Sequence, residues 1–270
     1  MKVFFIIFLF ICSFNSFTQP KIEFNSEKTN TGFIILANNS EFCSVSVRIK
    51  FQLKNLLSSN GDEFIFLVPA KTNQFKITDF KIVNENDGFS YSYDVVSTFG
   101  DVTLTKYDSN YQYGLPFEKG NEFQVQQGYF GKYTHQKERS LDIDMPKGTR
   151  VVAARKGMII SQVDYNNKHC TDPSCLKYNN YIDIIHEDGT IANYSHLKYN
   201  SCKFKVGDEV NEGDIIAESG ETGYTSGPHL HFVVYLPTLE NKKTISTLFK
   251  INNGNDFVLL EEKKFYLKNY

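Results

Sequence analysis

The clearest pattern of apolar and polar positions runs from residue 43 to residue 54, where the two kinds alternate without interruption. One face carries Cys43, Val45, Val47, Ile49, Phe51 and Leu53, and the other face carries serine, arginine, lysine and glutamine. A period of two is typical of an antiparallel strand that is buried on one face only. Residues 43–54 are therefore predicted to form a half-buried strand.

More β-rich runs follow between turn clusters, and residues 20–110 as a whole predict a small β-sandwich. The alternation returns with Phe89, Tyr91, Tyr93 and Val95 on one face. This part of the chain contains no histidine, and its sequence does not indicate a role. The stretch 100–128 is interrupted by glycine, aspartate and proline, which predicts a connection and a domain boundary near residue 110.

The second part, residues 111–270, is again rich in short strand-like runs. Apolar runs at 150–153, 158–163, 181–186, 191–194 and 230–235 predict strands, and the sequence Glu187-Asp188-Gly189 predicts a hairpin turn. No segment after Thr18 has the period and length of a helix. We expect an all-β chain, in which a β-sandwich-like domain precedes a domain built on an antiparallel sheet that ends in a C-terminal β tail.

The first eighteen residues have the form of a secretory signal peptide. Lys2 precedes an apolar run at residues 3–12, and small and polar residues follow as far as Gln19. This run is about half of the roughly 20 apolar residues that a membrane span needs. We expect cleavage near Thr18, export to the periplasm or the extracellular space, and no stable membrane insertion.

Composition and charge narrow the classes of partner. The chain has 270 residues, of which 41% are hydrophobic, and its 29 basic and 31 acidic residues leave a formal net charge of −2. A nearly neutral chain has no extended field to hold a phosphate backbone. Nucleic acid is therefore not expected as a partner.

Export changes the interpretation of the cysteines that follow the signal peptide, at positions 43, 170, 175 and 202. Disulfides persist in oxidising compartments. Cys170 and Cys175 lie five residues apart in a polar segment with a proline, which predicts a surface loop closed by a local disulfide. A second metal site that uses His169 is the alternative, and no partner at a metal-binding spacing supports it.

Candidate chemistry is concentrated in the second part, which holds all six histidines. His229 and His231 lie two residues apart on a predicted strand, so both imidazoles point to the same face. Such a pair alone is also typical of a strand edge with two surface histidines. The loop before it is rich in small residues, with Gly220, Gly223, Gly227 and Pro228, and would let the backbone approach a ligand closely.

His135 and Asp142 lie farther upstream, on either side of a six-residue segment. A neutral imidazole and a carboxylate both bind Zn²⁺ well, and one imidazole from the pair at 229 and 231 would complete three protein ligands. Three ligands with an open fourth position are the pattern of a catalytic zinc site. His196 ends another predicted strand and remains a candidate outside the coordination shell.

Several stretches together resemble the M23 zinc endopeptidases, the LytM or lysostaphin-type peptidases of peptidoglycan. The stretches that carry the resemblance, in family order, are residues 134–135, 141–143, 145–149, 152–157, 193–197, 206–210 and 220–232. Each motif alone is weak, whereas the set in register is specific. The six residues between His135 and Asp142 depart from the short spacing of many relatives, although some branches of the family share it.

The resemblance implies an M23-type antiparallel β-sheet fold and one Zn²⁺ per chain. It implies that His135, Asp142 and His231 hold the metal, and that His196 and His229 are uncoordinated catalytic histidines. Which of these two histidines is the general base stays open. His186 has no partner in the motif and is interpreted as a structural residue of its strand.

The function that the resemblance implies is hydrolysis of peptide cross-links in bacterial peptidoglycan. The small residues of the loop before His229 suit Gly or D-Ala beside the scissile bond. A D-Ala cross-link is favoured over a Gly-Gly bridge, because the sequence shows none of the wall-targeting modules that often accompany glycyl-glycine specialists. A non-catalytic M23-like activator or cell-wall-binding module is the chief alternative, and it predicts that a ligand is missing. A third class, a biotinyl or lipoyl carrier, is suggested by residues 206–214, but the chain lacks the Met-Lys attachment site there.

Overall fold

The computed structural model describes residues 19–240 and 242–270 of the chain, and the predicted signal peptide at 1–18 lies outside the described residues. These residues form β-strands joined by loops, with two short 3-10 helices. The prediction of an all-β chain is confirmed. Within this described part, no helix is long and apolar enough to cross a membrane.

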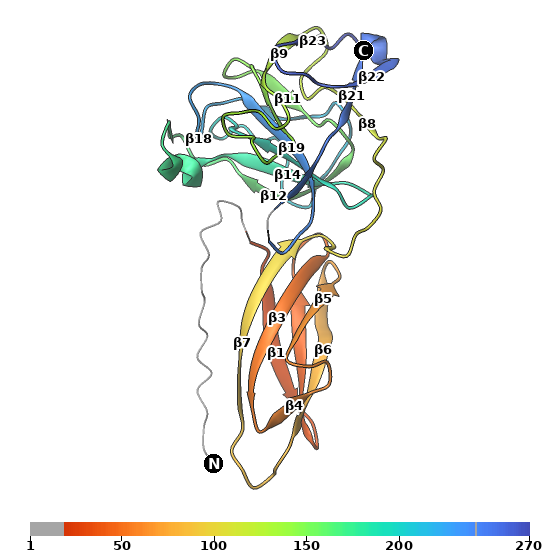
Figure 1. Cartoon of the computed structure of the whole chain (residues 1–270), viewed down its shortest axis with the longest axis vertical. Helices are drawn as coiled ribbons and strands as arrows, with labels where there is room; N and C mark the ends of the chain where they lie inside the picture. The colour runs from red at the N-terminus through yellow and green to blue at the C-terminus, as the bar shows by residue number, and fades with distance from the viewer. Residues whose placement is uncertain (1–18, 241) are drawn as a thin grey trace.

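Two antiparallel sheets form the elongated N-terminal part that is drawn in red to yellow in Figure 1. One sheet has the order β1-β2-β6-β4 and the other the order β5-β3-β7. The rings of Phe51 and Phe80, one from each sheet, meet edge to face at 4.9 Å between centroids. The strands are β1 (Ile22–Lys28), β2 (Gly32–Asn39), β3 (Val45–Lys54), β4 (Leu56–Ser58), β5 (Glu63–Val68), β6 (Thr72–Ile82) and β7 (Ser90–Phe99).

The alternation predicted over residues 43–54 is realised in β3. Val45, Val47, Ile49 and Phe51 are buried between the two sheets. Ser46, on the opposite face, is buried as well, because its hydroxyl donates to the carbonyl of Gly100 and accepts from the amide of Val102. The polar face of β3 is therefore buried near the start of the strand and exposed only towards its end at Lys54.

A nine-stranded sheet forms the second part, in the order β16-β12-β14-β15-β19-β10-β9-β23, with β20 paired to β19. The hairpin between β14 and β15 turns at Gly189, where φ is +79°, so the predicted turn is confirmed. The strands are β9 (Glu122–Gln127), β10 (Ser140–Ile143), β12 (Gly157–Val163), β14 (Tyr181–Ile185), β15 (Ile191–Ser195), β16 (Glu209–Val210), β19 (Leu230–Leu236), β20 (Lys243–Ile245) and β23 (Phe265–Leu267).

Three small sheets accompany this large sheet in the second part of the chain. They pair β11 (Arg150–Val152) with β17 (Ile215–Glu218), β13 (His169–Cys170) with β18 (Gly223–Tyr224), and β21 (Leu248–Ile251) with both β8 (Gln112–Tyr113) and β22 (Asp256–Leu259). The two 3-10 helices are η1 (Pro173–Tyr178) and η2 (Asn252–Gly254).

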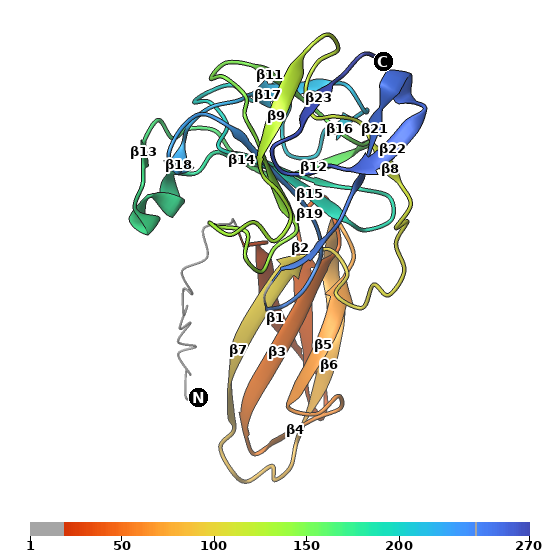
Figure 2. The same cartoon turned by 45° about the horizontal axis from the view of Figure 1, so that its top comes forward.

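The two faces of the large sheet have different environments. Leu141, Ile143, Leu230 and Phe232 point into the main apolar core. Ile160, Ile191 and Tyr235 instead pack with the core of the N-terminal sandwich. The sandwich therefore abuts the large sheet, as Figures 1 and 2 show from two directions, and the division of the chain near residue 110 stays a prediction.

His186 follows β14 and is 3% exposed, away from the other histidines of the sheet. Its Nδ1–H donates to the carbonyl of Lys156 at 2.8 Å. Its Nε2 is buried and has no hydrogen-bond partner among the described residues. Burial lowers the pKa of His186 from 6.5 to about 4, because the charged ring cannot be solvated there.

This burial predicts a pH dependence of stability. Between pH 6.5 and about 4 the unfolded chain binds a proton at position 186 and the folded chain does not. The stabilisation is therefore complete above pH 6.5 and decreases as the pH falls towards 4, by up to about 3 kcal/mol. In His186→Asn the amide nitrogen can replace Nδ1–H without titrating. Urea unfolding between pH 4 and 8 should show a shallower pH slope for this variant, and equal slopes would contradict the assignment.

Candidate metal centre

The register of two neighbouring strands brings two of the predicted ligands together. Asp142 in β10 is paired directly with His231 in β19. Leu230 and Phe232 point into the core, so the alternation of the strand points His231 to the opposite face. His135 reaches the same place from the loop between β9 and β10 and is 1% exposed.

The three side chains converge on one point. Nδ1 of His231 lies 3.0 Å from Oδ1 of Asp142. Nε2 of His135 lies 3.3 Å from each of these two atoms. Tetrahedral zinc with bonds of about 2.0 to 2.2 Å keeps neighbouring ligand atoms about 3.3 Å apart. Two imidazole nitrogens and a carboxylate oxygen at these separations fit Zn²⁺ in both chemistry and spacing.

Backbone and amide groups orient these side chains from behind. Nδ1–H of His135 donates to the carbonyl of Gly128 at 3.3 Å, which leaves Nε2 directed to the site. Gln127 donates from Nε2 to Oδ2 of Asp142 at 2.8 Å, which leaves Oδ1 facing the two histidines. The backbone amides of Tyr133 and Thr134 donate to Oε1 of Gln127 and fix the orientation of its amide.

The electrostatics of the group favour a cation. Burial alone would raise the pKa of Asp142, but hydrogen bonds from His135 and His231 hold it well below 3.8. Burial alone would lower the pKa of His135, but the Asp142 carboxylate raises it above 6.5. A buried carboxylate that stays ionised needs positive charge beside it, which protons on the histidines or a metal ion can supply.

His196 and His229 stand beside the group with their rings 4.6 Å apart between centroids. Nδ1 of His196 contacts the carbonyl of Thr222 at 2.7 Å, and Nδ1 of His229 contacts the carbonyl of Gly227 at 2.9 Å. A carbonyl oxygen only accepts, so each Nδ1 carries a proton that it donates to its carbonyl. Nε2 of His229 lies 3.6 Å from Oδ1 of Asp142.

The pKa of His196 is lowered to about 3 by burial and by the neighbouring His229 and His231. The ring is therefore neutral at physiological pH. The structure thus brings together all five side chains that the sequence analysis selected, three around one point and two at its side.

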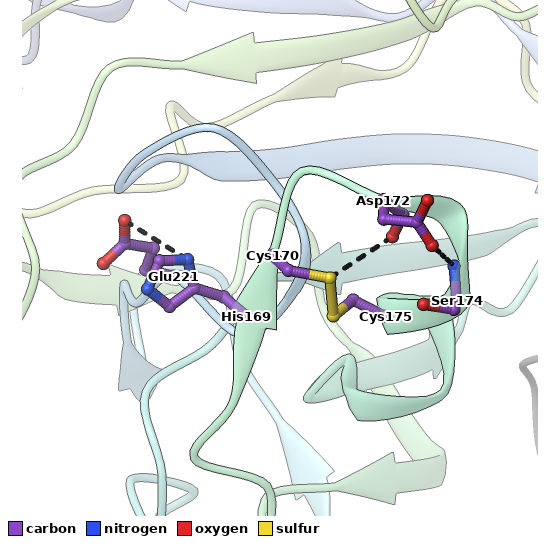
Figure 3. The surroundings of a disulfide bond; sticks show 6 residues. All are labelled: His169, Cys170, Asp172, Ser174, Cys175 and Glu221. Atoms are coloured by element: carbon purple, nitrogen blue, oxygen red, sulfur yellow. Dashed lines mark hydrogen bonds and ion pairs between the residues drawn. A yellow bond between two sulfur atoms is a disulfide. The ribbon is translucent and has the colours of Figure 1, made fainter.

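A loop closed by a disulfide flanks the group. Cys170 and Cys175 are bonded, as predicted, whereas Cys43 and Cys202 are free thiols. Figure 3 shows Cys170 on β13 and Cys175 on η1, with His169 turned towards Glu221. The pairing of β13 with β18 attaches this loop to the segment that leads to His229. Among the described residues, His169 belongs to no group of metal ligands.

Sequence reasoning missed the residues that support the ligands. Gln127 belongs to a strand that carries no motif, and Asn179 and Thr222, both hydrogen-bonded to His196, belong to loops. Thr225, whose hydroxyl lies 3.2 Å from Nδ1 of His229, belongs to the glycine-rich loop. Amides and hydroxyls are too common for one sequence to single them out.

Comparison with known proteins gives the class of the second domain. Residues 136–246 match the family model of peptidase family M23. An uncharacterized metalloprotease of Buchnera aphidicola is 36% identical over 118 residues, which cover 42% of this chain and 28% of the relative. The peptidoglycan DD-endopeptidase ShyC of Vibrio cholerae is 33% identical over 94 residues, which cover 35% and 19%.

Among solved structures, the catalytic domain of the antimicrobial peptidase lysostaphin from Staphylococcus simulans is 27% identical, with a TM-score of 0.33. That match covers 46% of this chain and 87% of the lysostaphin domain. The match of residues 136–246 to peptidase family M23 confirms the resemblance seen in the motifs. The matched region spans less than a third of the length of the two curated relatives named above.

The geometry predicts the effect of removing single ligands. The wild-type chain should retain one zinc ion, whereas His231→Ala and Asp142→Ala each leave two protein ligands and should lose it. His169→Ala is the matched control, because His169 is a metal-capable side chain outside the group. Elemental analysis after gel filtration measures the stoichiometry. Full zinc content in both ligand variants would refute the assignment.

Proposed function

We propose that this chain is a zinc metalloendopeptidase that hydrolyses the peptide part of bacterial peptidoglycan. The observation that supports this most is the convergence of His135, Asp142 and His231, with the rings of His196 and His229 beside them. A non-catalytic M23-like module would not need this set. The substrate lies outside the cytoplasm, which agrees with the predicted export to the periplasm or the extracellular space.

The roles in the mechanism follow from which atoms are free. Zinc, when bound, lowers the pKa of a water ligand to about 7 and polarises a carbonyl group. His135, Asp142 and His231 would hold it. His196 and His229 each direct Nδ1–H to a carbonyl, that of Thr222 and that of Gly227, which leaves Nε2 of each ring for the reaction. One of them would accept the proton of the attacking water at an unprotonated Nε2, and the other would carry a proton at Nε2 and donate it as a hydrogen bond to the oxyanion.

The group suits amide hydrolysis better than glycan cleavage. Glycosidases usually need two carboxylates on either side of the scissile bond. Here the group contains a single carboxylate, and Asp142 faces the two ligand histidines. A Lewis acid with two imidazoles is instead suited to attack on a carbonyl.

We favour the D-Ala cross-link over a Gly-Gly bridge as the scissile bond. The loop that precedes His229 contains the small residues Gly223, Thr225, Ser226 and Gly227, and Gly223 adopts a φ of +87°. A wall made largely of backbone suits small residues beside the scissile bond. ShyC, one of the matched relatives, is named a DD-endopeptidase, and this agrees with the preference.

Digestion of purified sacculi tests this function. Mass spectrometry of the products should show cross-linked dimers converted to monomers, with glycan lengths unchanged. His196→Ala should keep its zinc and lose turnover by about 10² to 10⁴, the usual contribution of a general acid or base. Shortened glycans with intact cross-links, or full activity in the metal-loaded variant, would contradict the proposal.

A further inference from the structure

His196 is held in an unusual backbone conformation. It follows the last residue of β15 and has a φ of +62°. Residues with a side chain rarely adopt this left-handed region, which costs about 1 to 2 kcal/mol. Because this backbone sets the direction of the imidazole, whatever stabilises it also aims the ring.

The side chain of Asn179 contacts this backbone directly. The amide N–H of His196 donates to Oδ1 of Asn179 at 3.0 Å. Asn179 lies immediately after η1, on the loop that carries the disulfide, seventeen residues before His196. Among the described residues, the side chain of Asn179 forms no hydrogen bond to a metal-ligand side chain. Its effect on the site therefore passes through His196.

A chain of hydrogen bonds fixes which way the Asn179 amide faces. Its Nδ2 donates to Oγ of Ser195 at 3.0 Å, and that hydroxyl donates its one proton to Oδ1 of Asn193 at 2.7 Å. Nδ2 of Asn193 in turn donates to Asp183 at 2.8 Å. Since Oγ of Ser195 has no second proton, it can only accept from Asn179. The amide must therefore turn its oxygen towards His196.

This series of hydrogen bonds is anchored in the interior of the protein. Asp183, Asn193 and Ser195 are each 3% exposed or less. Asn193 and Ser195 alternate on β15 and share the face of the sheet that carries His231. The polar chain thus runs under the candidate site and ends at the backbone of His196.

The backbone of Asn179 is also fixed. A Cβ on Gly223 would lie 2.9 Å from the Cα of Asn179, so the β18 segment packs directly on it. The next amide, of Asn180, donates to Oγ1 of Thr222, whose carbonyl receives the ring proton of His196. Two loops therefore hold His196, one at its backbone and one at its ring.

We propose that Asn179 is a positioning residue, which keeps His196 in the left-handed conformation that directs its Nε2 to the reaction centre. This inference rests on the proposed function of His196. The disulfide between Cys170 and Cys175 closes the turn of η1 that precedes Asn179 and holds it next to β18.

A double-mutant cycle tests this role. Asn179→Leu should lower kcat by about tenfold to a hundredfold, as expected when a reacting group is displaced by about 1 Å, with KM and zinc content unchanged. In the His196→Ala background the same change should cause no further loss. Lys177→Ala, an exposed neighbour in η1, is the control and should behave like wild type. An equal loss in both backgrounds, or no loss in either, would overturn the proposal.

A second readout does not depend on the substrate. In ¹⁵N NMR spectra the Nδ1–H of His196, assigned by its absence in His196→Ala, should exchange slowly in the wild type and in Lys177→Ala. It should be broadened or shifted in Asn179→Leu. An unchanged signal would overturn the role of Asn179 even if the chain proved inactive on peptidoglycan.

Ser195→Ala covers the case in which Asn179→Leu does not fold. It removes the acceptor that fixes the amide, and it should give a smaller loss of kcat that again disappears in the His196→Ala background. A loss of the same size in both backgrounds would count against positioning.

Discussion

The candidate site depends on the antiparallel register of three strands, β10, β19 and β15. This register pairs Asp142 with His231, and His231 with Ser195, in one row across the sheet. A slip of one residue in β19 would exchange His231 for Leu230 or Phe232 and point the imidazole into the core. The apolar residues on the other face, which are fully buried, thus fix the register and with it the positions of the ligands.

A polar layer on a buried sheet face has to be satisfied by hydrogen bonds. Gln127, Asn193 and Asn179 are amides that link carboxylates, hydroxyls and backbone groups around the row of ligands. Leaving such groups unpaired in a buried site costs about 1 to 3 kcal/mol each. The network therefore supports the fold and at the same time limits the orientations of His196 and Asp142.

The sequence predicted the parts of the structure that local patterns encode. The alternation in β3, the hairpin at Gly189, the local disulfide and the grouping of His135, Asp142 and His231 all follow from spacing or from family motifs. It did not reveal contacts between distant loops, such as Asn179 with His196. Ser46 is buried and Val95 is 36% exposed, against the strict alternation, because the elements that pack against a strand, and not its own sequence, decide which side chains are covered.

The central claim is that His135, Asp142 and His231, and not the two neighbouring histidines, hold a zinc ion. Anomalous diffraction at the zinc absorption edge, on crystals grown with zinc, tests it most directly. The account predicts one strong peak about 2.0 to 2.2 Å from Nε2 of His135, Oδ1 of Asp142 and Nδ1 of His231, with the rings of His196 and His229 outside bonding distance. A peak bonded to His196 or His229, or no peak between the three ligands, would contradict it.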